Sequence, residues 1–202
     1  MKFFSTLFKY LVLIFIVLLT IIMSFNISII FPKHYIDTLI YIILFLSYSI
    51  LYIFFFRKKL SFVEVFIHEF THLIFAIFTF KHIKGFFVER ESGYLSYKGS
   101  NDFLISLSPY FFPIVLVFVL ILSFSFDKEN LIIIKYIVVV LYASFLLKTI
   151  MNWSFNDPDI KNPGKFYSFI FVISMQIILF IVVCDFIFQN FSNFELLFQI
   201  NL

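Results

Sequence analysis

The sequence predicts an all-α polytopic membrane protein with about six transmembrane helices and a small β-hairpin after the third of them. Hydrophobic residues make up 62% of the 202 residues and charged residues only 13%, a composition that soluble domains do not have. Long apolar runs recur along the chain, and each is long enough to cross a bilayer as one helix. Residues 81–102 form the one sizeable polar segment, in which two aromatic runs flank a glycine-containing turn typical of a hairpin.

Short polar breaks separate the six expected spans. The first span follows Lys2 and Lys9. Because its apolar run is long and no small-x-small cleavage site follows, we expect it to be retained rather than removed as a signal peptide. Pro109 and Pro113 near the start of the fourth span predict a kinked entry. The tail after Gln189 is short and amphipathic, which favours a position in the membrane interface. The expected spans cover residues 11–31, 35–56, 60–80, 103–126, 131–151 and 166–188.

Charge and cysteine content exclude several classes of function. The formal net charge of +3 is small, and the lysines and arginines fall in short clusters between apolar runs, so no nucleic-acid partner is expected. The single cysteine, Cys184, excludes an intrachain disulfide and a cysteine-rich zinc site. The sequence contains no repeats and no linkers, so we expect residues 1–202 to form one membrane domain. The basic residues divide almost evenly between the two sides of the membrane and do not fix its orientation.

The motif His68-Glu69-Phe70-Thr71-His72 lies within the third expected span. Positions four apart on a helix are about 40° apart around the axis, so the two histidines project from one face and can present two imidazole nitrogens to one metal ion. Glu69 points about 100° away from His68, beside that position. This is the H-E-x-x-H pattern, in which two histidines bind zinc and the glutamate is the general base that acts on water.

A structural cluster of buried polar groups is the alternative to a metal site. The chain has only four histidines and six glutamates, so a chance H-E-x-x-H is improbable. Ionisable groups at bilayer depth are also costly unless they are paired or functional, which favours the metal site. Glu64, one turn before His68, is either an acid that orients an imidazole or an interfacial acid at the start of the helix.

A catalytic zinc site needs a third protein ligand and an open position for water. Six residues after the second histidine stands Phe78, which argues against a metzincin. Glu89 and Glu91 lie in the expected hairpin and would make a gluzincin-type site, whereas Asp157 and Asp159 follow the fifth span. The third and fifth spans end on the same side of the membrane, so the segment after the fifth can fold back to the motif. An irregular segment at that depth is tolerated where it lines a cavity.

With these residues the chain resembles the site-2 protease family of intramembrane zinc metalloproteases, in its small bacterial form. The family pattern has H-E-x-x-H on one core span, then a β-hairpin, a second core span, and an aspartate ligand on a third. The corresponding parts are the motif at residues 68–72, residues 85–99, the span with Pro109, and the segment with Asp157 and Asp159. The metalloprotease-like core covers about residues 61–164, and the spans in residues 1–59 lie outside the resemblance.

The resemblance implies a multi-pass integral protein of the bacterial cell membrane that hydrolyses peptide bonds of a membrane protein or peptide. His68, His72 and one of the two aspartates would bind Zn²⁺, and Glu69 would be the general base. The expected surroundings are the lipid bilayer, the substrate and, as a further partner, a regulatory membrane protein.

The third-ligand segment departs from the family pattern, which reads Asn-x-x-Pro and then Leu-Asp-Gly. This chain has Asn152, and it offers Asn-Asp-Pro-Asp-Ile in place of Leu-Asp-Gly. We expect Asp159 rather than Asp157 to be the ligand, because it lies farther from the span end and Ile160 after it can anchor the returning segment. Asn152 or Asn156 could donate a hydrogen bond to the substrate backbone or to an oxyanion, although turn formation is the more common role in a proline-rich loop.

Two other functions stay open at the level of the sequence. One keeps the fold and the metal without hydrolysis: a metal-binding membrane protein that regulates or assembles a partner. The other is a membrane gluzincin-type peptidase with a glutamate as third ligand. A transporter is disfavoured, because polar groups concentrate on one span and one loop and no matching pair of broken helices suggests inverted repeats.

Overall fold

The computed structural model describes residues 2–25, 35–56, 61–99 and 102–189, and these are mostly helical. The expected interfacial tail after Gln189 lies outside the described residues. In chain order the elements are α1 (Lys2–Phe25), α3 (Tyr35–Leu51), the π-helix η1 (Tyr52–Phe56), α4 (Ser61–Phe78), β1 (Ile83–Val88), β2 (Gly93–Tyr97), α5 (Phe103–Phe111), α6 (Ile114–Ser123), α7 (Lys128–Asn152), α8 (Pro158–Lys161) and α9 (Lys165–Gln189).

Helices that can cross a membrane dominate the described residues. Four are long and apolar enough, and they cover Thr6–Ser24, Thr38–Phe56, Glu129–Asn152 and Lys165–Phe188. A fifth span results if α5 and α6 are counted together. The prediction of an all-α polytopic membrane protein is confirmed, with four or five described spans against the six expected. The motif helix α4, with 18 residues, is not among them.

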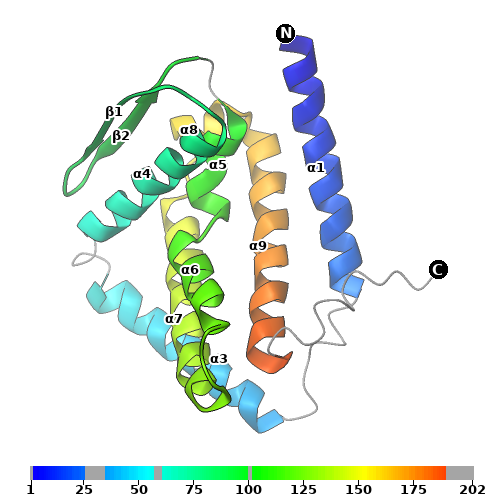
Figure 1. Cartoon of the computed structure of the whole chain (residues 1–202), viewed down its shortest axis with the longest axis vertical. Coiled ribbons are helices and arrows are strands. Elements are labelled where there is room, and N and C mark those ends of the chain that lie inside the picture. The colour runs from blue at the N-terminus through cyan, green and yellow to red at the C-terminus, as the bar shows by residue number, and fades with distance from the viewer. Residues whose placement is uncertain (1, 26–34, 57–60, 100–101, 190–202) are drawn as a thin grey trace.

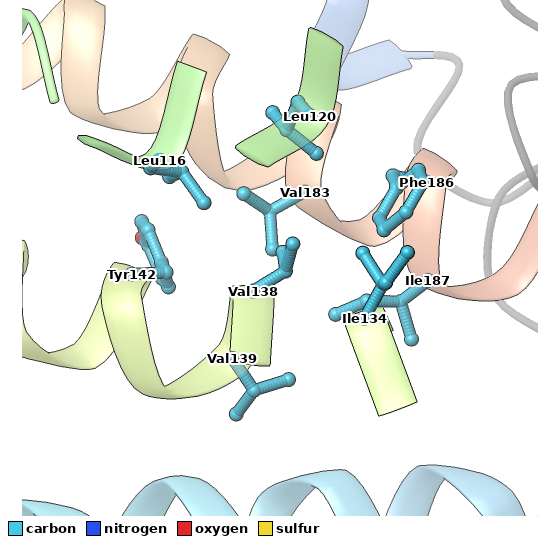
Figure 2. Close-up of a cluster of buried hydrophobic side chains, with 9 residues drawn as sticks. All are labelled: Leu116, Leu120, Ile134, Val138, Val139, Tyr142, Val183, Phe186 and Ile187. Atoms are coloured by element: carbon cyan, nitrogen blue, oxygen red, sulfur yellow. The ribbon is translucent and has the colours of Figure 1, made fainter. Parts of the chain in front are cut away.

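The long helices pack side by side (Figure 1). Helix α9 lies between α1 on one side and α7 on the other, and α3 runs obliquely against α7. Lipid tails are as apolar as the side chains, so close packing rather than exclusion of water holds such helices together. Figure 2 shows one buried cluster of this kind between α6, α7 and α9, formed by Leu116, Leu120, Ile134, Val138, Val139, Tyr142, Val183, Phe186 and Ile187.

The kink expected in the fourth span is a break between two helices. Helix α5 ends at Phe111, α6 begins at Ile114, and the two meet at an angle of 66°. Pro113 has no N–H to continue the helix, and a proline disfavours helical backbone in the residue before it. Phe112 is accordingly extended, with φ −114° and ψ 97°. Pro109 lies inside α5, so the second proline marks the break.

The expected β-hairpin is confirmed as the antiparallel pair β1–β2. It rests on α4, where the ring of Phe86 packs edge-on against Phe66 with centroids 6.5 Å apart. At the base of the hairpin, Lys81 and Asp102 form a salt bridge of 3.8 Å. Asp102 also caps α5 by accepting a hydrogen bond from the N–H of Leu104 at 3.0 Å. These contacts join the hairpin to the start of α5 and to the motif helix (Figure 1).

The short helix α8 follows α7 and redirects the chain before α9. Asp157 caps it by accepting a hydrogen bond from the N–H of Asp159 at 2.9 Å, and Pro158 stands at the start, where no N–H is needed. Ile160 is fully buried in a hydrophobic cluster with side chains of α5 and α9. The hydroxyl of Ser168 donates to the carbonyl of Ile160 at 2.9 Å. These contacts fix the position of Asp159.

We expect Ile160→Ala to lower the free energy of unfolding by about 2–5 kcal/mol, because it leaves a cavity where a side chain is fully buried. Denaturant unfolding in detergent micelles, followed by the fluorescence of Trp153, measures the change. Ile150→Ala is the matched control: Ile150 is 62% exposed on α7, so its loss should cost no more than about 0.5 kcal/mol. Equal losses in the two variants would show that Ile160 does not anchor α8.

Candidate metal centre

The two histidines of the motif share one face of α4, and their ring centroids are 4.9 Å apart. His72 is buried, while His68 is partly exposed at the edge of a cavity. The ring of Tyr110 from α5 packs edge-on against His68, with centroids 5.6 Å apart. Glu69 is 9% exposed and borders the same cavity. The helix therefore presents two imidazoles and one carboxylate to a common space.

Asp159 reaches the two histidines from α8, far along the chain. Its Oδ2 lies 3.1 Å from Nε2 of His72 and 3.4 Å from Nε2 of His68. The potential ligand atoms of the three side chains all lie within 4.8 Å of one another. Within the part of the chain that the structure describes, this is the group of histidine, cysteine and carboxylate side chains that could hold a metal ion.

The hydrogen bond on the other side of the His72 ring fixes its tautomer. Nδ1 of His72 lies 2.7 Å from the carbonyl oxygen of Ile105, and because a carbonyl only accepts, Nδ1 carries the proton. In the neutral ring, Nε2 then presents a lone pair to the carboxylate of Asp159, so an acceptor faces an acceptor. A cation between the two atoms, either a proton or a metal ion, makes this contact favourable. Proteins commonly orient metal-binding histidines through such a backbone carbonyl.

The donor set fits zinc. Two imidazole nitrogens and one carboxylate oxygen are protein ligands of catalytic zinc sites, which leave a further position for water. Burial alone would raise the pKa of the Asp159 carboxyl. Where the rings of His68 and His72 are protonated, their hydrogen bonds and charge outweigh burial and hold that pKa below its ordinary value. The charge and the type of the three groups both suit a divalent cation.

Asp157 does not contact the histidines. One of its oxygens caps α8, and the other accepts a hydrogen bond from the hydroxyl of Tyr110 at 2.9 Å. The carbonyl of Tyr110 in turn accepts a hydrogen bond from the amide of Gln176 in α9 at 2.8 Å. Asp157 therefore ties α8 to α5 and holds the segment on which Asp159 stands.

Glu69 lies against Gly93, the first residue of strand β2. A Cβ placed on Gly93 would come within 2.4 Å of the Glu69 side chain, so only glycine leaves room for the carboxylate at this point. Helix α4 thus carries Glu69, and the hairpin limits where its side chain can lie.

Two cavities meet at the motif. One, of about 420 Å³, lies beside β2 and is lined by Glu69 and by all three potential ligands. The other, of about 910 Å³, is an open polar cleft that extends from Glu69 to Lys148 and Asn152 at the end of α7. An extended chain can therefore reach the space in front of the histidines.

The other residues singled out in the sequence lie around the cleft or away from it. Asn152 lines the cleft, whereas Asn156 is exposed on the segment before α8 and lines neither cavity. Glu89 and Glu91 are exposed in the hairpin turn, and neither belongs to the group that could hold a metal. Glu64 accepts a hydrogen bond from the hydroxyl of Tyr52, not from an imidazole.

Four residues at the site are not apparent from the motif: Gly93, Ile105, Tyr110 and Lys148. The sequence around Gly93 and Tyr110 points only weakly to a role at the site. Gly93 is a glycine of a hairpin turn, and Tyr110 follows the proline of a helix. Lys148 carries a stronger signal as a cation inside an apolar span. The carbonyl of Ile105 has none, because every residue offers one.

The fold and this group of side chains define a class of protein. It is an integral membrane protein whose H-E-x-x-H helix meets an aspartate from a later segment, the arrangement of a membrane metallopeptidase. Residues 35–156, more than half of the chain, match the family Peptidase_M50B, described as Peptidase M50B-like. The chain belongs to this family, and the resemblance to site-2 proteases is confirmed. Comparison with curated proteins gives no match, and comparison with solved structures gives none either.

The matched region differs in extent from the core expected from the motif. It begins with α3, which that core left out, and it ends at Asn156, before Asp157 and Asp159. Membership points to a membrane peptidase, and the family is zinc-dependent in general. The choice of third ligand therefore depends on the geometry of this chain.

We expect the purified protein to bind about one zinc ion per chain, because the three side chains form one site. His72→Ala should abolish stoichiometric binding. Asp159→Asn should weaken zinc affinity by at least about tenfold, and Asp157→Asn, which changes a positioning residue, should weaken it less. Metal analysis of the purified variants and competition with a chromogenic chelator measure these effects.

The Asp157→Asn variant is also the control, since it makes the same chemical change two residues away. Full zinc content in a His68→Ala, His72→Ala double variant would rule out this site. A larger loss of affinity in Asp157→Asn than in Asp159→Asn would exchange the roles of the two aspartates.

Proposed function

We propose that the protein is an intramembrane zinc metalloprotease that hydrolyses peptide bonds of a membrane protein or membrane-associated peptide. The observation that supports this most is the meeting of Asp159 with both histidines of the motif while Glu69 borders the same cavity. Membership in a peptidase family supports the reaction class. The resemblance to the small bacterial form favours the bacterial cell membrane as its location.

In this proposal His68, His72 and Asp159 hold the metal. Zinc bound there would lower the pKa of a coordinated water towards neutrality and polarise the scissile carbonyl. Glu69 takes the proton of the attacking water and later delivers it to the leaving amine. The carbonyl of Ile105 keeps the His72 ring in the orientation that directs Nε2 to the metal position.

The hairpin offers a way to hold the substrate. Strand β2 borders the cavity of the three ligands, and an extended segment could pair with a hairpin edge by strand addition. Helical hydrogen bonds hide the carbonyls of a membrane-spanning substrate, so the segment must unwind before it is cut. Asn152, at the end of α7, can donate a hydrogen bond to the backbone of that segment across the open cleft.

We expect Glu69→Gln to keep its zinc and to lose at least about 100-fold in the rate of peptide hydrolysis, because the amide cannot accept the proton of water. Metal analysis and cleavage of a fluorogenic membrane peptide in detergent measure the two quantities. Glu89→Gln is the matched control: this glutamate is exposed in the hairpin turn, so the variant should cleave at the wild-type rate.

The same pair of variants separates the competing functions. Loss of zinc and cleavage in Glu89→Gln or Glu91→Gln would indicate a gluzincin-type site. A Glu69→Gln protein that keeps its full biological effect in cells would mean that the metal serves to regulate or assemble a partner, without hydrolysis.

Gly93→Ala tests the role of the hairpin in placing the general base. The added Cβ would clash with Glu69, so we expect cleavage to fall by about tenfold or more while zinc content is unchanged. Gly85→Ala is the control in the other strand, where the added Cβ would meet only the Ser96 hydroxyl at 3.2 Å. Wild-type rates in Gly93→Ala would show that Glu69 does not depend on this contact.

A further inference from the structure

An apolar pocket lies beside His68, on the side away from the hairpin. Its volume is about 330 Å³, and its walls come from α3, η1, α4, the break between α5 and α6, and α7. Phe112 and Pro113 of the break form part of the wall, so the bend that the second proline imposes helps to shape this space. The pocket is a consequence of the fold and is not used by the mechanism above.

The pocket opens at the candidate metal centre. Three residues line both the pocket and the open polar cleft: Glu64, His68 and Lys148. Because Glu69 borders that cleft and His68 stands in both walls, a peptide bond held in front of the histidines lies at the mouth of the pocket. A side chain next to that bond can therefore enter it.

Lys148 marks this mouth with a positive charge. Its ammonium donates a hydrogen bond to the main-chain carbonyl of Glu64 at 2.6 Å. The carboxylate of Glu64 accepts from Tyr52, and among the described residues no ion pair includes Lys148. An ammonium has three donors, so two remain for another acceptor. The nearby carboxylates of Glu64 and Glu69 partly offset the cost of this charge inside a membrane span, and its two remaining donors suit a bound acceptor.

We propose that this pocket receives one large apolar side chain of the substrate, such as leucine or phenylalanine, from a residue that flanks the scissile bond. In this arrangement Lys148 donates a hydrogen bond to the backbone carbonyl of the bound segment. The inference rests on the proposed protease function and adds a substrate class to it: membrane segments with a bulky apolar residue beside the cleaved bond.

The size and the mouth of the pocket favour a side chain over a lipid. Ligand pockets span about 300–1,000 Å³, and a volume of about 330 Å³ is at the lower end of that range. One aromatic or branched side chain fits in such a space with room left over, whereas a volume at this end of the range is small for the two acyl chains of a phospholipid. Lys148 lines both the pocket and the cleft, and a peptide backbone in the cleft supplies a carbonyl acceptor for its donors.

Ser144 allows the pocket to be filled without a change at the metal centre. It lines the pocket one turn before Lys148, and its hydroxyl shares a hydrogen bond of 2.7 Å with the hydroxyl of Tyr48. Ser144→Leu adds volume inside the pocket. Ser144→Ala is the matched control, because it removes the same hydrogen bond and adds no volume. Val140→Phe, one turn earlier in the same wall, is a second filling variant.

The test measures binding and does not depend on cleavage. Fluorescent peptides of the form Ala-Ala-X-Ala-Ala-Ala, with X as Ala, Leu or Phe, are titrated into zinc-loaded protein carrying Glu69→Gln. With no change in the pocket, and equally with Ser144→Ala, we expect the Leu and Phe peptides to bind about tenfold more tightly than the Ala peptide. With Ser144→Leu or Val140→Phe the preference should fall, because each variant removes part of the space, while affinity for the Ala peptide and zinc content stay the same.

A preference for Leu and Phe that both filling variants leave unchanged would overturn the inference, and so would equal binding of all three peptides to the unfilled protein. Phospholipid that co-purifies with the protein and is displaced by the filling variants, without any change in peptide binding, would assign the pocket to a lipid. Failure of the protease proposal gives a different result: wild-type protein and Glu69→Gln would then be equally inactive on every peptide, whatever the binding preference.

Discussion

The contact between Asp159 and the two imidazoles is the interaction on which the rest of the structure depends. The Ile105 carbonyl holds the proton of His72 on Nδ1, so Nε2 faces a carboxylate that can only accept. Such a contact is unfavourable without a cation between the groups. The protein nevertheless brings these groups together from segments far apart in the sequence, and the arrangement is understandable if a metal ion is what they hold.

Much of the surrounding fold supports that contact. The buried side chain of Ile160 anchors α8 against α5 and α9, and the hydrogen bonds of Asp157 to α8 and Tyr110 fix the direction from which Asp159 approaches. In the hairpin, Gly93 leaves the space that the Glu69 side chain occupies. Each of these contacts spans two elements, so the metal position is defined by the fold as a whole more than by the motif helix alone.

The sequence predicted the elements better than their contacts. Apolar runs and the motif predict helices, and the aromatic runs around Glu-Arg-Glu-Ser-Gly predict the hairpin, because these are local signals. The break at Pro113 was predicted as a kink for the same reason. The contact of Gly93 with Glu69 and the hydrogen bond from Tyr110 to Asp157 join distant segments, and no local pattern encodes them. Helix α4 also ends at Phe78, two residues earlier than its apolar run suggests, and it is not among the spans found in the described residues.

The most direct test of a metal centre built from α4 and α8 is the anomalous scattering of a crystal of the zinc-loaded wild-type protein, recorded at the zinc absorption edge. We expect a single strong peak among Nε2 of His68, Nε2 of His72 and a carboxylate oxygen of Asp159, at about 2.0–2.2 Å from each ligand atom. A peak coordinated by Glu89 or Glu91 of the hairpin, or one that leaves Asp159 without contact to the metal, would contradict it.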